Sequence, residues 1–384
     1  MRDVWIRGAA MTHFTKHDRG ARELVEEAVA GALADAGLEP RQVDAAFAGN
    51  ASGGLMYGQE SVRGQVVLRR SGLTGVPIVN VENACASSAT ALHLGWQAVA
   101  GGAHDRVVVI GYEKMDHRSR PRRRQAINAT MDLDEAAELF GPEAARERYL
   151  QLDAMGTSRQ FSRELLSLLS VKNRYHGSLN ELAHHRQPVT VEQVLASPAV
   201  SGSLTSLMCA PLTDGAACLV LCSSGSRHGR AGGVRVAASV LLSGRGDDMR
   251  RRSSIQETAR QAYEAAGVGP EDLDVVEVAD VTSLAELYVY RELGLCREGD
   301  EERLLKERTV WLGGRLPVNP SGGVLARGHP MGATGAAQVV ELTWQLEGRC
   351  GQRQVPASRL ALAQVAGGWI GTDVAASCVH VLQA

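Results

Sequence analysis

The sequence predicts an α/β protein built from two similar halves, in which parallel sheets are covered by helices. Two observations support this fold class: the chain repeats itself internally, and helix-like and strand-like patterns alternate along both halves. A third is size, because 384 residues with 44% hydrophobic and 22% charged side chains suffice for two core-bearing domains.

The internal repeat is clearest at an offset of 230 positions. Without any gap, it places Ala32, Ala36, Gly37, Pro40 and Asp44 on Ala262, Ala266, Gly267, Pro270 and Asp274. Each copy has the pattern of an amphipathic helix, a glycine stop, a proline turn and a short apolar strand, at 45–48 and at 275–278. Identity at the helix stop, the turn and the strand start favours duplication over chance.

A long stretch of the first half interrupts the repeat. It lies between two apolar, strand-like runs, and it contains a basic loop and two helical patterns (strands 106–111 and 216–222; loop 118–124; helices 143–153 and 159–173). We interpret it as a loop domain, at about residues 115–205, inserted over the core of the first half.

A Gly- and Ser-rich run, 223–233, follows the second of these strands. Such a run is typical of a linker, so we place the N-terminal half at 1–228 and the C-terminal half at 233–384.

The composition excludes several classes of function. The formal net charge is −2, so the chain lacks the overall basic field that drives nucleic-acid binding. Seven cysteines scattered through apolar segments indicate reduced thiols in the cytoplasm, and their spacing predicts no metal site. The start of the chain lacks the apolar core of a signal peptide, and no run reaches the roughly 20 apolar residues that span a bilayer.

Cys85 is the first candidate for chemistry. It lies in the segment 81–89, where small polar residues give way to the apolar run of a buried helix. In the first turn of a helix, a thiol faces unpaired backbone N–H groups and the positive end of the helix dipole, which favour thiolate and lower its pKa. Buried structural cysteines are commoner than nucleophiles, so the prediction needs further support.

A histidine in a glycine-rich frame supplies that support. His329 lies within 319–335, where repeated glycines let the backbone pass close to a ligand and leave the imidazole accessible. A second, weaker match at an offset of 244 places Cys85 on His329, and predicts that thiol and imidazole occupy equivalent helix starts. A third glycine-rich run, 365–371, is interpreted as a loop whose N–H groups could hold an oxyanion.

Three motifs together resemble those of thiolases, specifically of the sterol-carrier-protein or lipid-transfer type. They are Asn-Ala-Cys-Ala-Ser at 83–87, Pro-Leu-Thr-Asp-Gly-Ala-Ala at 211–217 and Gly-His-Pro-Met-Gly-Ala-Thr-Gly at 328–335. The likeness runs essentially end to end, and it includes Val-Lys-Asn-Arg at 171–174 and Ala-Glu-Leu at 285–287.

The resemblance implies a thiolase fold: two halves of βαβαβαββ order forming a layered α-β-α-β-α core, with an inserted loop domain. It implies that Cys85 takes an acyl group as a thioester and that His329 activates the thiol. Backbone N–H groups of Cys85 and near Gly368 would form the oxyanion hole. The substrate would be coenzyme A or an acyl-CoA, with no permanently bound cofactor. Arg122 and Arg123 could meet its phosphates, although a solvated basic loop explains them equally well.

Two motifs depart from the family pattern. The usual His-Asp-Ala-Phe or His-Asp-Cys-Phe is here Ala-Asp-Val-Thr at 279–282, and the histidine of His-Asn-x-Gly-Gly is Gln364. An ordinary thiolase must move a proton at the α-carbon of an acyl-CoA, so this chain needs either another acid or base, or an acyl acceptor that requires less help. The candidates, none of which the sequence singles out, are Asp280, Tyr288, Ser321 and Cys378.

The leading hypothesis is therefore an acyl-CoA C-acyltransferase that cleaves, or in reverse makes, the carbon–carbon bond of an atypical or bulky β-ketoacyl-CoA. One alternative is a thiolase-fold retro-aldolase, which cleaves a β-hydroxyacyl-CoA without an acyl-cysteine. Another is a degenerate thiolase-like subunit that stabilises a catalytic partner. The resemblance also implies a homodimer, and it points to a heteromeric complex with a small zinc-ribbon and OB-fold protein.

Overall fold

The computed structural model describes residues 1–384 except 141–160, 227–228, 230–231, 246–251 and 372. The helix expected at 143–153 and part of the 223–233 linker lie outside the described residues. The boundaries proposed for the two halves and for the inserted domain therefore remain a proposal.

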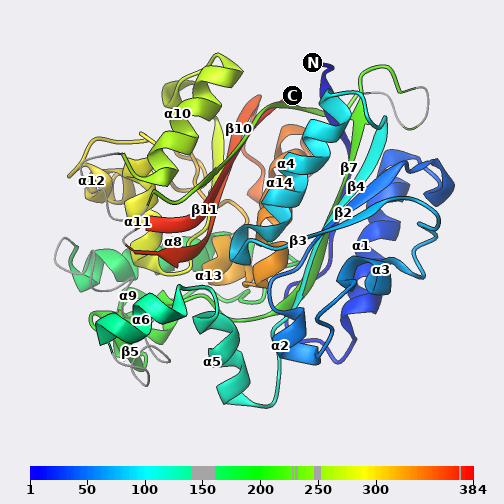
Figure 1. The fold of residues 1–384 in the computed structure, drawn as a ribbon. Helices are drawn as coiled ribbons and strands as arrows, with labels where there is room; N and C mark the ends of the chain where they lie inside the picture. The colour runs from blue at the N-terminus through cyan, green and yellow to red at the C-terminus, as the bar shows by residue number, and fades with distance from the viewer. Residues whose placement is uncertain (141–160, 227–228, 230–231, 246–251, 372) are drawn as a thin grey trace.

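Five layers follow one another across Figure 1, as the α-β-α-β-α prediction requires. On the right, α1 (Ala21–Ala36) and α3 (Arg63–Leu68) cover the strands of the first half. In the middle, α4 (Ser87–Ala100) and α14 (Thr334–Leu346) lie between the two parts of the sheet. On the left, the strands of the second half are covered by α8 (Arg163–Ser178), α10 (Ser254–Ala266) and α11 (Ser283–Glu292).

Nine of the described strands form one mixed sheet, in the order β3-β2-β4-β7-β1-β8-β11-β10-β9, and β5 (Ala199–Ser201) and β6 (Leu204–Thr205) pair separately. Their bounds are β1 (Val4–Met11), β2 (Ala45–Gly49), β3 (Ile78–Val81), β4 (Arg106–Lys114), β7 (Asp214–Ser223), β8 (Val234–Ser243), β9 (Val275–Val278), β10 (Leu360–Ile370) and β11 (Asp373–Gln383). The expectation of parallel sheets holds only for β3-β2-β4 and for β9-β10. The remaining neighbours are antiparallel: β7 and β11 turn back along β4 and β10, and β1 and β8 run antiparallel to them and to each other.

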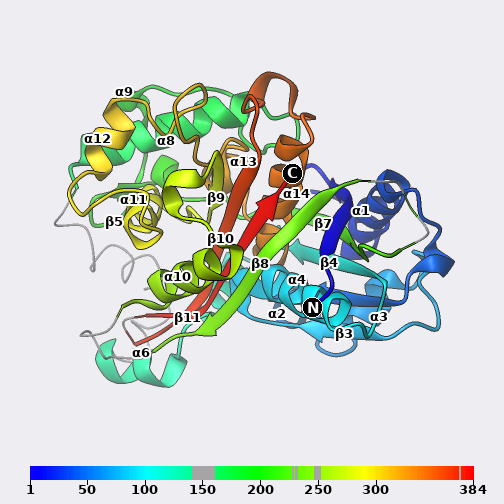
Figure 2. The same cartoon turned by 90° about the horizontal axis from the view of Figure 1, so that it is seen from above.

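The two halves meet at the centre of this sheet (Figure 2). There, β1 pairs with β8 through only two residue pairs, Trp5 with Arg235 and Ile6 with Val234. At the far edge, Val318 forms an isolated parallel bridge to Val276 of β9, in the place that β3 occupies beside β2 in the first half. Each half therefore follows the expected βαβαβαββ order, with the third strand of the second half reduced to a bridge.

The 230-residue repeat is also a repeat of structure. Both α1 and α10 end at a glycine in the left-handed conformation, Gly37 with φ 64° and Gly267 with φ 70°. A 3-10 turn follows in each half, at Pro40–Gln42 and Pro270–Asp272, before β2 and β9 begin. The prediction of two similar halves is confirmed at these elements.

The weaker match at an offset of 244 is three residues out of register. The 3-10 turn that precedes α4 is Ala84–Ala86, and the turn that precedes α14 is Met331–Ala333. These equivalent turns are separated by 247 positions rather than 244. Cys85 therefore corresponds to Gly332 rather than to His329. Two shared residues were too few to fix the register, although thiol and imidazole do lie just before the two inner helices.

Side chains that alternate along each strand pack against the helices on the two faces of the sheet. In β4, Val108 and Ile110 pack in the cluster that contains α1, whereas Val107 and Val109 pack in the cluster that contains α4 and α14. The two inner helices approach closely, because a Cβ on Gly335 would lie 2.7 Å from the Cβ of Ala89. The starts of α4 and α14 are thereby held side by side.

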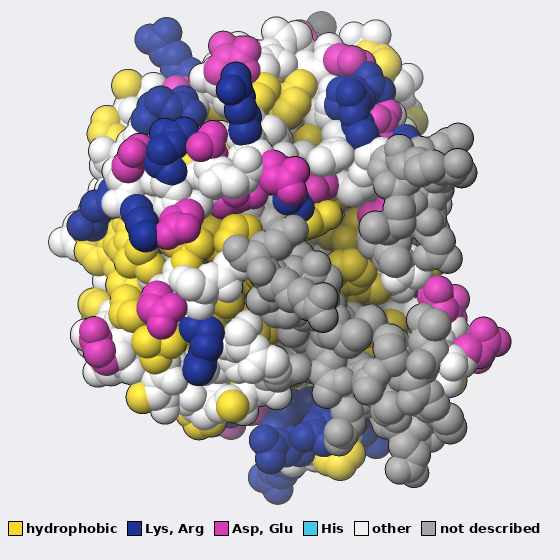
Figure 3. Space-filling view, turned by 90° about the vertical axis from the view of Figure 1, so that its left-hand side faces the viewer, with side chains coloured by type: hydrophobic (Ala, Val, Ile, Leu, Met, Phe, Trp, Pro, Cys, Tyr) yellow, Lys and Arg dark blue, Asp and Glu magenta, His cyan; other side chains and the backbone are white. Residues whose placement is uncertain are grey.

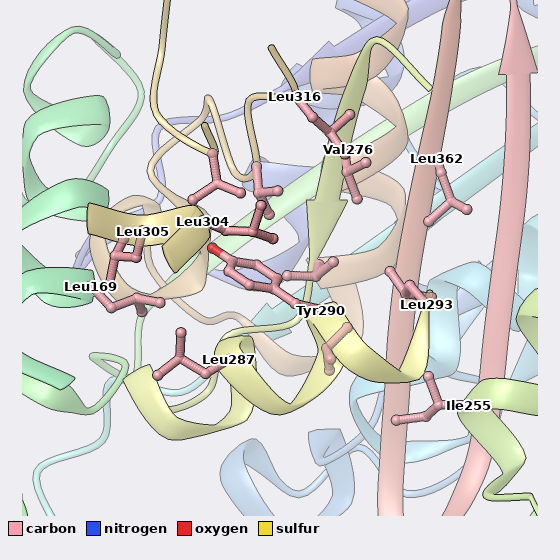
Figure 4. Close-up of a cluster of buried hydrophobic side chains, with 14 of the residues drawn as sticks. Leu169, Ile255, Val276, Leu287, Tyr290, Leu293, Leu304, Leu305, Leu316 and Leu362 are labelled. Atoms are coloured by element: carbon pink, nitrogen blue, oxygen red, sulfur yellow. The ribbon is translucent and has the colours of Figure 1, made fainter. Parts of the chain in front are cut away.

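The second half has its own core beneath α11. Figure 4 shows Tyr290 of α11 surrounded by aliphatic side chains from several elements, among them Leu287, Val276, Leu304 and Leu316. The Tyr290 hydroxyl donates a hydrogen bond of 2.5 Å to Glu286 Oε1, which satisfies its polar end inside this core.

The segment between β4 and β7 carries several short elements. They are α5 (Arg120–Asn128), α6 (Leu133–Phe140), α8, α9 (Val191–Ala196), β5 (Ala199–Ser201) and β6 (Leu204–Thr205). α8 agrees with the helix expected over 159–173. The expected basic loop at 118–124 is mostly the helix α5, because Ser119 caps its first turn and Pro121 suits a helix start. Among the described helices, none is long and apolar enough to cross a membrane.

Candidate active site

Cys85 lies at a strained turn between β3 and α4. It belongs to the 3-10 turn Ala84–Ala86 and is only 4% exposed, so it precedes α4 rather than lying in its first turn. Ala84 has φ 48°, in the left-handed region, and its N–H donates to Glu82 Oε1 at 2.6 Å. The turn thus fixes the thiol at the start of an inner helix.

The thiol lies against the imidazole predicted from the sequence. Cys85 Sγ is 3.3 Å from His329 Nε2, although 244 residues separate them in the chain. The backbone N–H of His329 donates to Pro211 O at 3.0 Å, so the 211–217 motif positions the histidine loop. The structure therefore brings all three sequence motifs together at one point.

Thr334 determines which nitrogen of His329 carries the proton. Its Oγ1 lies 3.0 Å from Nδ1 of His329 and donates its own proton to Pro330 O at 3.3 Å. Because this hydroxyl proton is already used, we assign the Thr334 oxygen as the acceptor of an Nδ1–H bond. Nε2 is then unprotonated and can take the proton of the Cys85 thiol.

Burial sets the charge state of this pair, and it corrects the sequence prediction for the thiol. Burial raises the pKa of Cys85 to about 12, and the carboxylates of Glu113 and Glu82 add to the rise. Burial also lowers the pKa of His329 to about 4, with the charge of Arg327 acting in the same direction. Desolvation and nearby anions outweigh the helix dipole, so the resting pair is a neutral thiol and a neutral imidazole.

The walls around Cys85 are apolar and mostly small. The buried cluster that contains it comprises Met56, Cys85, Ala86, Ala89, Met115, Ala126, Ala279, Met331, Val365, Ala376 and Cys378. Ala279, the residue at the family's histidine position, is therefore a wall of the thiol's own cluster. Cys378 on β11 is in this cluster too, its Sγ lies 3.7 Å from Thr90 Oγ1, and burial raises its pKa to about 12.

A pocket of about 290 Å³ opens beside the Cys85 turn. Its lining comes from that turn, from the segment after α5 and from the facing ends of β10 and β11 (Glu82, Asn83, Ala84, Ala129, Thr130, Met131, Asp132, Gly367, Gly368, Ile370, Ala375 and Ala376). The pocket leads from the surface to the backbone just before the nucleophile candidate.

The glycines of 365–371 lie in strand β10 rather than in a loop. A Cβ on Gly367 would lie 2.1 Å from Asn83 O and 2.9 Å from Ala86 N, so only glycine allows the strand to approach the Cys85 turn. Gly368, which has φ 67°, adjoins Thr130 O instead, and Trp369 N donates to that oxygen at 2.9 Å. The predicted oxyanion glycine thus lies in the pocket wall, next to the glycine that contacts the turn.

Two of the acid/base candidates are engaged in buried networks elsewhere. Asp280 accepts hydrogen bonds from the N–H groups of Val324 and Leu325, at 2.6 and 3.2 Å, and so holds the start of α13 (Gly323–Arg327). Burial raises the pKa of Asp280 well above its usual range, and the nearby carboxylate of Glu286 adds to this. The Asp280 carboxylate therefore holds the first turn of α13 and is not directed at Cys85.

Ser321 belongs to a second network. Its Oγ donates to Glu277 Oε2 at 2.9 Å, and Arg327 donates to both side chains at 3.2 Å. Tyr288, the remaining candidate, is half-buried on α11 with the guanidinium of Arg291 4.9 Å from its ring centre. Of the four candidates, the structure places Cys378 in the same buried cluster as Cys85.

The arginines predicted to meet coenzyme A lie on α5. Arg122 is exposed and approaches His117 Nε2 at 3.4 Å, and Arg123 donates to the carbonyl of His117. Figure 3 shows Lys and Arg side chains grouped at the lower edge of the molecule, the level at which α5 lies in Figure 1. The far end of α5 leads directly into residues 129–132, which line the pocket.

Sequence reasoning missed two residues of this site. Thr334 was part of a quoted motif without a role, and only the geometry shows its contact with His329. Glu113 is fully buried in the structure. In the sequence it continues the apolar run of β4, and a carboxylate in such a run was the signal that could have identified it. Among the described residues, no group of three or more His, Cys, Asp or Glu side chains is arranged to hold a metal ion.

Comparison with known proteins identifies the family. The family model described as "Thiolase, N-terminal domain" matches residues 4–165, and the one described as "Thiolase C-terminal domain-like" matches residues 239–383. An acetyl-CoA acetyltransferase of Methanothermobacter thermautotrophicus is 37% identical, over 99% of both chains. The chain belongs to the thiolase family.

Further relatives place this thiolase in the sterol-carrier-protein type. Human sterol carrier protein 2 is 34% identical over 94% of this chain and 69% of its own. The benzoylsuccinyl-CoA thiolase subunit BbsB of Thauera aromatica is 34% identical over 96% of this chain and 95% of its own. These relatives support an acyltransferase that uses CoA-linked substrates.

Solved structures show the same fold. The "Ltp2-ChsH2(DUF35) aldolase" has a TM-score of 0.82 at 22% identity, covering 100% of this thiolase and 98% of that chain. Human mitochondrial 3-ketoacyl-CoA thiolase in complex with CoA has a TM-score of 0.75 at 18% identity, with 100% and 98% covered.

Proposed function

We propose that this thiolase forms an acyl thioester on Cys85 and cleaves, or in reverse makes, the carbon–carbon bond of a bulky or atypical β-ketoacyl-CoA. The observation that supports this most directly is the 3.3 Å contact between Cys85 Sγ and His329 Nε2, the nitrogen left free by the Thr334 contact. A neutral thiol and a neutral imidazole are a suitable starting pair, because proton transfer between them creates the nucleophile only when it is needed.

In the cleavage direction, the thiol proton moves from Cys85 Sγ to His329 Nε2, and the sulfur bonds to the β-keto carbon. Backbone N–H groups of Cys85 and Gly368 stabilise the resulting oxyanion. The bond between the α- and β-carbons then breaks, which leaves the acyl group on sulfur and an enolate of the shortened acyl-CoA. Free coenzyme A finally attacks the thioester. Its thiol proton restores the acid that protonated the enolate, and the departing Cys85 thiolate takes back the proton held by His329.

The enolate must gain a proton, and Cys378 is the candidate we favour for donating it. It shares the buried cluster of Cys85, whereas Asp280 and Ser321 are engaged by α13 and by Glu277. Its high pKa keeps it protonated at neutral pH, as a general acid requires.

Support for a bulky substrate comes from the site and from one relative. The buried cluster around the thiol includes the small side chains of Ala86, Ala279 and Ala376, which take up little of the space beside Cys85. The relative BbsB is named for benzoylsuccinyl-CoA, a substrate with an aromatic acyl group. We therefore propose an acyl group larger than acetyl for this thiolase.

We also propose a cytoplasmic homodimer that associates with a small zinc-ribbon and OB-fold protein. Association of two different chains is supported by two relatives, since BbsB is named as a subunit and the Ltp2 aldolase is named together with ChsH2(DUF35). The halves 1–228 and 233–384, with the insertion at 115–205, belong to the same proposal.

Mass spectrometry of the intact protein tests the proposed function. After incubation with an aromatic β-ketoacyl-CoA, we expect a mass increase equal to the acyl group, located on the peptide that contains Cys85 and removed by added coenzyme A. Cleavage of a β-hydroxyacyl-CoA without any adduct would instead establish the retro-aldolase. If the protein and its co-purified partner together gave neither an acyl adduct nor turnover of the substrate, this chain would be a structural subunit.

The double variant Arg122→Ala/Arg123→Ala tests the proposed coenzyme A contacts. We expect the KM for coenzyme A to rise roughly fivefold with little change in kcat, because surface contacts to phosphate contribute modestly and do not change in the reaction. Arg303→Ala, at an exposed position of helix α12 (Glu301–Lys306), is the matched control and should leave KM unchanged. An unaltered KM in the double variant would mean that α5 is only a solvated basic helix.

A further inference from the structure

Glu113 is a buried carboxylate at the meeting point of three segments. It lies at the end of β4 with no exposed surface. Its oxygens accept hydrogen bonds from Asn50 Nδ2 and Ala51 N, both at 2.9 Å, from Ser52 N at 3.3 Å and from Gly332 N at 3.1 Å. All four donors are neutral amides.

This carboxylate joins the two halves of the active site. Asn50, Ala51 and Ser52 follow β2 in the first half, whereas Gly332 belongs to the 3-10 turn that separates His329 from Thr334 in the second. The approach is close, because a Cβ on Gly332 would lie 2.7 Å from Tyr112 O and 2.9 Å from Asn50 Cα. A shift of Gly332 would therefore displace the imidazole and the threonine that orients it.

The same carboxylate lies behind the thiol. Met115, two residues after Glu113, and Met331, one residue before Gly332, are both walls of the Cys85 cluster. Burial raises the pKa of Glu113, whereas its amide donors stabilise the carboxylate without cancelling its charge, so the field of the ionised group acts across this low-dielectric wall. The other ionisable groups that face the pair are Glu82 on its own turn, Cys378 on β11 and Arg327 before the histidine.

We propose that Glu113 is a positioning residue for the Cys85–His329 pair: it holds the histidine loop through Gly332, and its charge opposes loss of the thiol proton to solvent. This inference rests on the roles proposed for Cys85 and His329. Once the proton has moved, the same charge stabilises the imidazolium, so Glu113 favours proton transfer to His329 over free ionisation of the thiol.

Alkylation of Cys85 by iodoacetamide tests the electrostatic part of this inference without any acyl-CoA. The rate is followed from pH 6 to 10 by mass spectrometry of the Cys85 peptide. In the wild type, whose Cys85 pKa is about 12, it should rise throughout. In Glu113→Gln, the profile should move down by roughly one pH unit, so that alkylation at a given pH is about tenfold faster. Glu82→Gln is the matched control and should shift less, because water screens an exposed carboxylate.

Glu113→Asp tests whether Glu113 positions the histidine loop, and it remains a usable test if Glu113→Gln fails to fold. It keeps the charge but retracts it by one methylene from Gly332 N, so the alkylation profile should stay near that of the wild type while acyl-adduct formation slows about tenfold or more. A folded Glu113→Gln with the wild-type profile, or a Glu113→Asp that acylates at the wild-type rate, would overturn the inference. Since alkylation requires no acyl-cysteine, failure of the proposed function would leave this first result intact.

Discussion

Replacement of Cys85 by alanine should abolish acyl-adduct formation and lower kcat by at least about 10⁴-fold, because no other group is placed to carry the acyl chain beside His329 among the residues that the structure describes. The fold should survive, since the change removes one buried sulfur from a cluster already rich in alanine. Intact-mass spectra after incubation with a β-ketoacyl-CoA, together with thermal unfolding, measure both effects.

Cys218→Ala is the matched control for this variant. Cys218 is a buried cysteine of β7 that packs in the cluster of α1, on the outer side of the sheet. It should acylate at the wild-type rate. An acyl adduct that persists in Cys85→Ala and maps to Cys378 would contradict the assignment of the nucleophile and exchange the roles of the two thiols.

Replacement of His329 by alanine should lower the rate of acylation by roughly 10²–10⁴-fold, the usual contribution of a positioned general base. Without it, the proton of a thiol whose pKa is about 12 has no acceptor at 3.3 Å, and little thiolate exists at neutral pH. Single-turnover acylation, followed by mass, reports this step directly.

Thr334→Val provides a graded comparison for the histidine. It removes the hydroxyl that lies 3.0 Å from Nδ1 and keeps the side-chain shape, so acylation should fall roughly tenfold, less than in His329→Ala. If the valine variant acylates like the wild type, the proposed tautomer control by Thr334 is wrong.

The repeat made much of the fold predictable. Glycine stops, proline turns and short apolar strands are local signals, and they fixed α1, α10, β2 and β9 at the expected residues. Strand direction was less accessible, because the glycine-rich run 365–371 indicated a loop, whereas it belongs to β10, which pairs antiparallel with β11. Glycines in β10 signal close approach to the Cys85 turn, which is a tertiary contact that only the folded chain reveals.

The site was predictable in its chemistry but not in its electrostatics. Cys85 and His329 each stood out by their local sequence, and the structure brings them to 3.3 Å. The direction of the thiol pKa was wrong, since burial and the carboxylate of Glu113 come from the assembled fold rather than from the helix start. For the same reason, Asp280 could not be distinguished from a catalytic acid before its bonds to α13 were known.

The seam between β1 and β8 gives this chemistry an unusual dependence on assembly. Only two residue pairs join the strands of the two halves there, and Cys85 and His329 stand on opposite sides of that seam. The reactive distance is therefore set by how the halves dock and not by either half alone. The packing of α4 against α14, where Gly335 meets Ala89, therefore holds the distance between sulfur and nitrogen, and a substitution that forces these helices apart should stop the chemistry before it unfolds either core.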